Sequence, residues 1–195
     1  MASHKLIENI NLSFAENGSI VEIGSARETA GADSSTFYFA ELSKKINCEF
    51  YSVDFSPQSQ SLAYQIIGKN AILSDGSAFL EKFHTISGRK ISVLYLDNFD
   101  VIYNEKHRAS LMRRVGNVYD SNHEELTNER SAIVHLDQMK TALPLLQLNN
   151  AVIVDDTTET EKGWWGKGAL VVPFLLGLGY TIESRSEDGV LLLSF

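Results

Sequence analysis

The chain has 195 residues, which is enough for one large hydrophobic core and a poor fit to two domains. Its formal net charge of -8 at pH 7 argues against a nucleic-acid partner, because phosphate binding requires a basic face. Cys48 is the only cysteine, which excludes an intrachain disulfide and a paired-cysteine metal or redox site. The first residues lack the apolar core of a signal peptide, and the most apolar stretch, 168–180, is too short to span a bilayer. We therefore expect a cytoplasmic protein that does not act on a membrane.

Short apolar runs alternate along the chain with segments of helical spacing. The expected strands are 19–23, 49–53, 70–74, 91–96 and 151–155, and the expected helices are 34–46, 57–67, 77–86, about 125–147, and 167–177. This alternation indicates a parallel sheet with right-handed crossovers. At the end of the chain, 180–184 and 190–195 flank an Asp-Gly turn and indicate a hairpin. The prediction is a single α/β domain over 1–195, with a Rossmann-like, doubly wound sheet that is mostly parallel and carries a C-terminal antiparallel hairpin strand.

An acid stands near the carboxyl end of each of the first four expected strands. These acids are Glu22, Asp54, Asp75 and Asp97. Parallel sheets bind ligands outside the carboxyl ends of their strands, so the four carboxylates converge on one rim. The first turn, which begins at Gly24, does not meet the G-x-G-x-x-G fingerprint of nicotinamide-dependent Rossmann enzymes, because positions 26 and 29 are Ala and Thr. Taken alone, that turn also fits a plain connection between a strand and a helix.

Five short motifs resemble those of the class I S-adenosylmethionine-dependent methyltransferases. They are VEIG at 21–24, VDFSP at 53–57, SDG at 74–76, LYLD at 94–97 and VIVDD at 152–156. The resemblance runs from about residue 19 to the end of the chain. It implies the fold derived above, with S-adenosylmethionine as cofactor.

The resemblance also implies how the first two strands meet the cofactor. Glu22 and Gly24 would line its methionine side, with Ser25 and Ala26 in the adjoining loop. Asp54 would accept hydrogen bonds from both ribose hydroxyls, which needs a group that only accepts.

The next two strands would complete the cofactor site. The resemblance implies that Asp75 holds the adenine amino group, with Gly76 and Ser77 alongside, and that Asp97 is the acid of the fourth motif. Asp75 is also placed to cap the helix that follows, and both roles can hold at once.

The connection between the fourth and fifth expected strands is long, from residue 98 to residue 150. Its later part has helical apolar spacing, whereas 98–124 has aromatic residues and histidines in a polar background. Long irregular connections at the ligand edge of a sheet are usually functional or mobile. We expect 98–124 to be a lid and substrate-recognition element, and the alternative is an ordinary surface excursion.

Three carboxylates are expected just beyond the transferable methyl group. Asp97 ends the fourth strand, and Asp155 with Asp156 ends the fifth, which is its neighbour in this fold. Three oxygen donors without a histidine or thiolate cluster suit Mg²⁺, with Mn²⁺ or Ca²⁺ as other candidates. The set resembles that of divalent-metal O-methyltransferases acting on sugar hydroxyls. The alternative is that Asp155 and Asp156 only cap the strand end.

The sequence offers several candidates for the general base. Methyltransferases of the catechol type, which the chain resembles, have a lysine shortly after the acid of the fourth strand. In this chain that acid is Asp97, and the next lysine is Lys106. His107 and His123 lie in the expected lid, and His135 lies in the expected helix, where it could equally be a buried structural histidine. The tandem Trp164-Trp165 could stack on an acceptor or serve as a packing anchor. The Gly-Lys-Gly run at 166–168 does not have the spacing of a phosphate-binding loop.

The leading function from the sequence is an S-adenosylmethionine-dependent, metal-assisted O-methyltransferase for a small hydroxylated acceptor. The alternative is a methyltransferase-fold module that binds the cofactor or a partner without turnover. A nicotinamide-dependent enzyme is disfavoured by the missing glycines. A homo-oligomer is left open, as is the identity of the acceptor.

Overall fold

The computed structural model describes residues 2–27, 34–121 and 125–194. Nine strands are assigned within them: β1 (Ser19–Ile23), β2 (Glu49–Asp54), β3 (Ala71–Leu73), β4 (Ile91–Leu96), β5 (Leu146–Asp155), β6 (Thr157–Thr160), β7 (Gly163–Gly166), β8 (Thr181–Arg185) and β9 (Gly189–Ser194). The α-helices are α1 (Ser35–Lys45), α2 (Pro57–Ile67), α3 (Gly76–Ile86), α4 (Glu105–Ser121), α5 (Asn128–Ala142) and α6 (Gly168–Gly177). Short 3₁₀ turns are η1 (Ser3–Ile7), η2 (Leu12–Ala15), η3 (Gly68–Asn70) and η4 (Leu143–Leu145).

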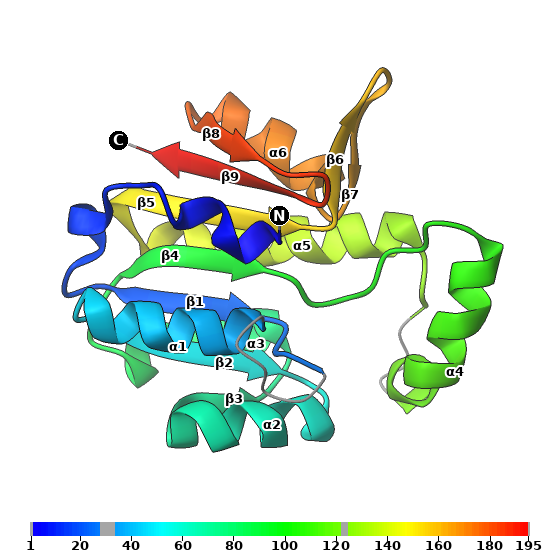
Figure 1. Cartoon of the computed structure of the whole chain (residues 1–195), viewed down its shortest axis with the longest axis horizontal. Coiled ribbons are helices and arrows are strands. Elements are labelled where there is room, and N and C mark those ends of the chain that lie inside the picture. Colours follow the sequence, from blue (N-terminus) through cyan, green and yellow to red (C-terminus); the bar gives the residue numbers. More distant parts are fainter. Residues whose placement is uncertain (1, 28–33, 122–124, 195) are drawn as a thin grey trace.

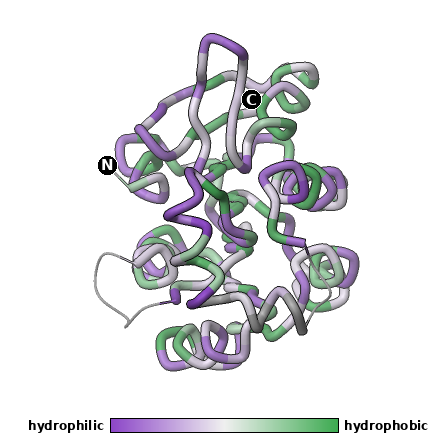
Figure 2. The backbone as a smooth tube through the Cα atoms, turned by 90° about the vertical axis from the view of Figure 1, so that its right-hand side faces the viewer, coloured by the Kyte–Doolittle hydropathy of each residue, from purple (hydrophilic) through white to green (hydrophobic). Residues whose placement is uncertain are grey.

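Seven of the strands form one sheet in the order β3-β2-β1-β4-β5-β9-β8. The first five are parallel to one another, and β9 pairs antiparallel with both β5 and β8. In Figure 1 the arrowheads of β1 and β4 point to the right, and Figure 2 turns that edge toward the viewer. This arrangement confirms the predicted doubly wound sheet with a C-terminal antiparallel hairpin strand.

Helices cover both faces of the sheet and produce two apolar cores. Helices α3, α5 and α6 pack on one face, against residues such as Val21 and Leu94. Helix α1 and the 3₁₀ turns η1 and η2 pack on the other face, against residues such as Ile20 and Val93. Both β1 and β4 are buried along their whole length, which explains why their sequences are almost continuous apolar runs.

Helix starts follow from the residues that precede them. Ser34, Ser56 and Thr127 each accept a hydrogen bond from a backbone N–H in the first turn of α1, α2 and α5, and Asp75 does the same for α3. Such capping satisfies donors that the helix itself leaves unpaired. The expected bounds of these helices were therefore close to those found, except that α5 ends at Ala142 and β5 begins at Leu146.

Two elements differ from the sequence prediction. The segment expected to be an irregular lid contains the helix α4, whose residues Leu111 and Tyr119 pack with Phe99 and Leu126 in a small separate core. The hairpin of β6 and β7 was not predicted, and it projects beyond the sheet edge in Figures 1 and 2. His123, a candidate base, lies outside the described residues, as do 122 and 124 of the expected lid.

Helix α6 is the most apolar helix but spans only Gly168–Gly177. Among the described residues, none of the helices has the length and apolar character that crossing a bilayer requires.

The close approach between the turn after β1 and the backbone after β4 can be tested at Gly24, which has a φ of 103°. A Cβ there would stand 2.4 Å from the backbone N of Asn98. Gly163 has a comparable φ of 112° but open space around it, so it isolates the conformational cost. We expect Gly163→Ala to lower the free energy of unfolding by about 1 to 3 kcal/mol, and Gly24→Ala to lower it further. Urea unfolding of both variants measures the difference, and equal losses would contradict the close approach.

Candidate functional site

Two cavities lie at the carboxyl edge of the parallel strands. The first has a volume of about 350 Å³ and is lined by residues that follow β2, β3 and β4 or belong to α3 and α5: Phe55, Asp75, Ser77, Asn98, Phe99, Arg130, Val134 and Asp137. The second has a volume of about 380 Å³ and is lined by Ala2, Ser3, His4, Ser35, Tyr95, Asp97, Tyr103, Asp155, Asp156 and Asp188. Asp97 and Asn98, consecutive residues after β4, therefore line different cavities.

The first cavity is lined by two of the three residues expected around adenine, Asp75 and Ser77. The Asp75 carboxylate accepts a hydrogen bond of 3.0 Å from the backbone N of Ala78, so the capping role is present, and the side chain also lines the cavity. Gly76 is buried where α3 meets the sheet, and a Cβ there would come within 2.5 Å of the Ile23 side chain. The Oδ1 atom of Asn98 is buried and has no hydrogen-bond partner within the part of the chain that the structure describes. A donor of a bound ligand would satisfy it.

Asp54 lies at the end of β2 beside this cavity. One carboxylate oxygen accepts the backbone N–H of Ser25 at 2.9 Å, and the other accepts that of Ser56 at 2.7 Å. Burial raises the pKa of Asp54 despite these two hydrogen bonds, which favour its charged form. An ionised carboxylate has about four acceptor sites, so each oxygen retains capacity for a further donor.

Glu22 is placed differently from the other rim acids. Its side chain is fully buried, and it accepts hydrogen bonds from the hydroxyls of Ser35, Thr36 and Ser52. Burial raises its pKa to about 7, although the three hydroxyl donors act in the opposite direction. Glu22 lines neither cavity, so in this structure it fixes the start of α1 against β1 and β2. Its predicted contact with a cofactor stays a prediction.

The turn after β1 is held by the same group of hydroxyls. Ser25 Oγ lies 2.7 Å from Ser52 Oγ, and the backbone N of Ala26 donates to Thr36 Oγ1 at 3.0 Å. The Arg27 guanidinium pairs with Asp100, which follows β4. This turn is therefore tied both to α1 and to the neighbouring strand end.

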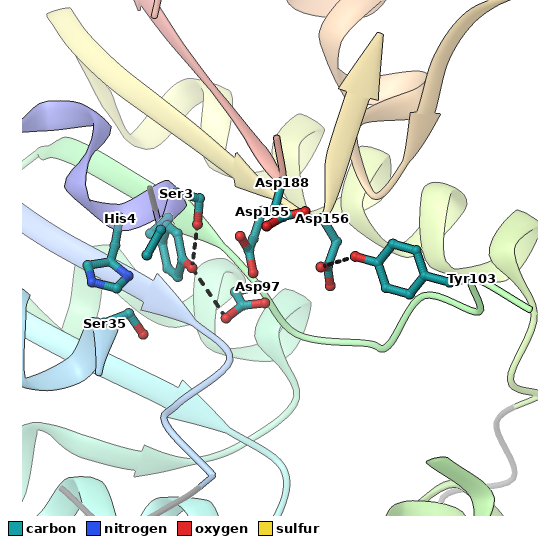
Figure 3. Close-up of a pocket in the computed structure, with 10 residues that line it drawn as sticks. Ser3, His4, Ser35, Asp97, Tyr103, Asp155, Asp156 and Asp188 are labelled. Carbon is teal, nitrogen blue, oxygen red and sulfur yellow. Dashed lines mark hydrogen bonds between the residues drawn. The ribbon is translucent and has the colours of Figure 1, made fainter. Parts of the chain in front are cut away.

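Four aspartates give the second cavity a strongly acidic lining (Figure 3). Carboxylate oxygens of Asp97, Asp155 and Asp156 lie within 4.8 Å of one another, which confirms that the two strand ends bring these acids together. Tyr95 donates to Asp97 Oδ2 at 3.3 Å, and Tyr103 donates to Asp156 Oδ1 at 2.6 Å.

Sequence reasoning missed the residue that organises these acids. Lys167 is 2% exposed, and its ammonium lies 2.5 Å from Asp97 Oδ1 and 2.9 Å from Asp156 Oδ2. A glycine stands on each side of Lys167, and this unusual run was the one available signal. The run does not have the spacing of a phosphate-binding loop, and its glycines instead let the chain turn back toward Asp156.

The charges within this cluster shift one another's ionisation. Burial lowers the pKa of Lys167, but the facing Asp97 and Asp156 outweigh burial and raise it well above its usual value. Burial raises the pKa of Asp156, but the Lys167 ammonium and the hydrogen bond from Tyr103 together outweigh that effect, and the net shift is downward. For Asp155, burial and the Asp97 charge both raise the pKa well above its usual value. The pKa of Asp155 is thus held above the ordinary range of an aspartate, and that of the adjacent Asp156 below it.

A divalent metal at the predicted site would bind the same carboxylate oxygens that the Lys167 ammonium contacts. The three acids are the group that was expected to bind it, and their spacing fits. However, Lys167 already contacts two of the three, and a divalent cation at the same oxygens would be repelled by it. The residues present therefore do not fit a metal while Lys167 is in place.

Aromatic side chains form one wall near the second cavity. The ring of Tyr103 lies 5.3 Å from that of Trp165 and 5.2 Å from that of His107, measured between centroids. His107 Nδ1 accepts a hydrogen bond of 3.4 Å from the backbone N of Tyr103, and His107 is not among the lining residues. Trp164 instead stacks under the Arg185 guanidinium at 5.2 Å. Both tryptophans therefore pack against other side chains of the protein, and stacking of either on an acceptor stays a prediction.

His135 does not reach either cavity. It is fully buried in α5, and its Nδ1 lies 2.7 Å from the carbonyl oxygen of Ser131. Burial, together with the nearby Lys167 charge, lowers its pKa to about 4. A neutral, enclosed imidazole with so low a pKa is a poor proton acceptor, so we assign His135 to packing rather than to the catalytic role expected from the sequence.

Comparison with known proteins agrees with the architecture. No protein-family model matches the chain, and no curated protein matches it in sequence. A Streptococcus mutans protein assigned as a methyltransferase and solved with S-adenosylhomocysteine (SAH) is similar in structure, with a TM-score of 0.54, 12% identity, and coverage of 99% of this chain and 96% of that one. A Clostridium thermocellum protein assigned as an rRNA methylase has a TM-score of 0.54 and 11% identity, over 98% of this chain and 94% of that one. The N-methyltransferase NodS of Bradyrhizobium japonicum has a TM-score of 0.50 and 14% identity, over 98% and 92% of the two chains.

The chain has the class I methyltransferase fold. At these identities the likeness concerns the fold alone. Within this fold, the carboxyl edge that carries both cavities is the edge at which doubly wound sheets bind ligands.

The buried Glu22 makes stability depend on pH. Its pKa rises from 4.5 in the unfolded chain to about 7 in the folded protein, so the folded state holds the proton more tightly. Glu22 therefore favours folding below about pH 4.5, and this contribution, of the order of 3 kcal/mol, is lost as pH rises through about 7. We expect Glu22→Gln to remove that part of the slope, as measured by urea unfolding between pH 4.5 and pH 7.5. The exposed Glu81→Gln is the control, and parallel curves for wild type and Glu22→Gln would contradict the assignment.

Proposed function

We propose that this protein is an S-adenosylmethionine-dependent methyltransferase that methylates a hydroxyl of a small acceptor. The observation that carries the proposal is the pair of cavities at the carboxyl end of β4, where Asp97 lines one and its neighbour Asn98 lines the other. A ligand bound in the first cavity can present a group to a second ligand in the second cavity. Group transfer between two bound molecules requires this arrangement.

The cofactor fits the first cavity and the strand ends beside it. Asp75, Ser77 and Asn98 would hold the adenine, and the spare acceptor capacity of Asp54 would hold the ribose hydroxyls. The bound cofactor would supply a sulfonium methyl group. The turn at Gly24 and Ser25 lies between Asp54 and the end of β4.

The acceptor would enter the second cavity, where Asp97 offers a carboxylate to the hydroxyl proton. Tyr95 and Lys167 hold the two oxygens of this carboxylate in fixed positions. The metal assistance expected from the sequence is not part of this mechanism, because the Lys167 ammonium already contacts two of the three acids that would bind the ion. A small acceptor is favoured over a nucleic acid because aspartates line the cavity and the chain has a net charge of -8.

An amine is the second candidate acceptor. The four aspartates would stabilise a positively charged ligand, and the face of Tyr103 or Trp165 could contribute a cation–π contact. Transfer to nitrogen would need the amine to lose its proton within the cavity, and the carboxylates are placed to accept it.

Cofactor binding is the first test. Calorimetry should show binding of S-adenosylmethionine and SAH to the wild type, and Asp54→Ala should weaken it by about 1.5 to 3 kcal/mol for each hydrogen bond lost to the charged group. Asp188→Asn, which changes a carboxylate of the second cavity, is the control and should leave cofactor binding intact. Failure of the wild type to bind either compound, or tighter binding of NAD, would refute the cofactor assignment.

Turnover is tested with S-adenosylmethionine labelled in the methyl group. Catechols, sugars, amino sugars and simple amines are offered in buffer with EDTA, and the labelled product is identified by mass spectrometry. We expect transfer to a hydroxylated compound, whereas transfer to amines alone would select the second candidate. Cofactor binding without transfer to any compound would favour the module without turnover.

A further inference from the structure

We propose that Lys167 is the resident cation of the aspartate cluster, and that it makes the cluster independent of metal by occupying the position a divalent ion would take. The three acids would then bind a divalent ion only in a protein that lacks the Lys167 ammonium. The inference does not depend on methyl transfer, because it concerns which cation faces the aspartates of the cluster.

The ammonium has a complete set of partners. Lys167 Nζ donates to Asp97 Oδ1 at 2.5 Å, to the Asp97 carbonyl oxygen at 3.1 Å and to Asp156 Oδ2 at 2.9 Å. An ammonium has three N–H donors, so these three contacts use all of them. Each carboxylate touched is one of the three whose oxygens lie within 4.8 Å of one another. Lys167 therefore occupies the cation position of the cluster rather than its margin.

The β6–β7 hairpin brings Lys167 to this position. Asp156 immediately precedes β6 and Lys167 immediately follows β7, so the hairpin returns the chain to its starting point. The backbone N of Lys167 donates to the carbonyl oxygen of Asp156 at 3.2 Å. The lysine and one of its carboxylate partners are thus the two ends of one closed loop.

The flanking glycines are required by this closure. Gly166 has a φ of 82°, and a Cβ there would lie 1.8 Å from the carbonyl oxygen of Asp156. A Cβ on Gly168 would lie 2.4 Å from the Thr157 side chain, whose Oγ1 accepts the backbone N–H of Gly168 at 2.8 Å. The two glycines of the Gly-Lys-Gly run therefore allow its backbone to pass close to that of Asp156 and Thr157. This close approach places the Lys167 ammonium in the acidic cluster.

This arrangement assigns Lys167 a positioning role toward Asp97. It holds one carboxylate oxygen and the backbone carbonyl of Asp97, while Tyr95 reaches the other carboxylate oxygen. A cation fixed by a covalent tether, unlike a bound ion, remains at every free-ion concentration. The site should then be indifferent to chelators.

Removal of the ammonium provides the test. Lys167→Met and Lys167→Gln are compared with wild type and with Lys162→Met, an exposed lysine on the same hairpin. Melting curves are recorded with EDTA and with Mn²⁺, and Mn²⁺ binding is measured directly by electron paramagnetic resonance. We expect no ion-dependent change in melting temperature for wild type or Lys162→Met. Both Lys167 variants should melt lower in EDTA and gain about 5 to 10 °C at an ion concentration about 100 times the dissociation constant.

A further variant locates the gained ion. Adding Asp155→Asn to Lys167→Met should remove the Mn²⁺-dependent gain, since it removes one carboxylate of the cluster. Variants that fold only when Mn²⁺ is present would also support the proposal. It is overturned if Mn²⁺ raises the melting temperature of wild type through these acids, if the folded Lys167 variants bind no ion, or if neither variant folds with the ion.

Discussion

The salt bridges of Lys167 with Asp97 and Asp156 are the interaction on which the ligand edge depends. A parallel sheet whose strands end in acids must compensate each buried carboxylate, since an unpaired charge in this environment is costly. Three different kinds of partner compensate the carboxylates at this edge of the sheet. Glu22 is surrounded by hydroxyl donors, Asp54 accepts two backbone N–H groups, and Asp97 and Asp156 share an ammonium.

These solutions also divide the acids by chemical role. Glu22 is enclosed and serves the architecture, because its oxygens are directed to hydroxyls of α1 and β2. Asp75 and Asp97 line cavities and can meet ligands. The position of an acid at a strand end therefore does not by itself distinguish a supporting residue from one that contacts substrate.

The parts of the fold that the sequence predicts are those in which burial is continuous. Strand β1 was expected at the bounds found because every residue in it is buried, and α2 begins where Ser56 and Pro57 define a cap. Helix α4 was missed because its inner surface packs on a loop and a small core around Phe99 rather than on the sheet, so few of its residues need to be apolar.

The candidate site was predictable to the extent that its residues follow strands. The three aspartates could be brought together from the neighbouring positions of β4 and β5 alone. Lys167 could not, because it meets Asp97 across 70 residues of chain, through a hairpin whose strands lack the alternation of a sheet with one buried face. The metal prediction followed from that omission: the carboxylates were identified correctly and their counter-charge was not.

The base and the tip of the β6–β7 hairpin are under different constraints. Thr157 opposes Gly166 at its base, whereas its tip, drawn hydrophilic in Figure 2, lies away from the sheet. Residues can be inserted into or removed from the tip without altering the register at the base, which fixes Asp156 and Lys167. The side of the protein that carries the second cavity can thus vary in length and composition at the hairpin tip while the contacts between Lys167 and Asp156 stay in place.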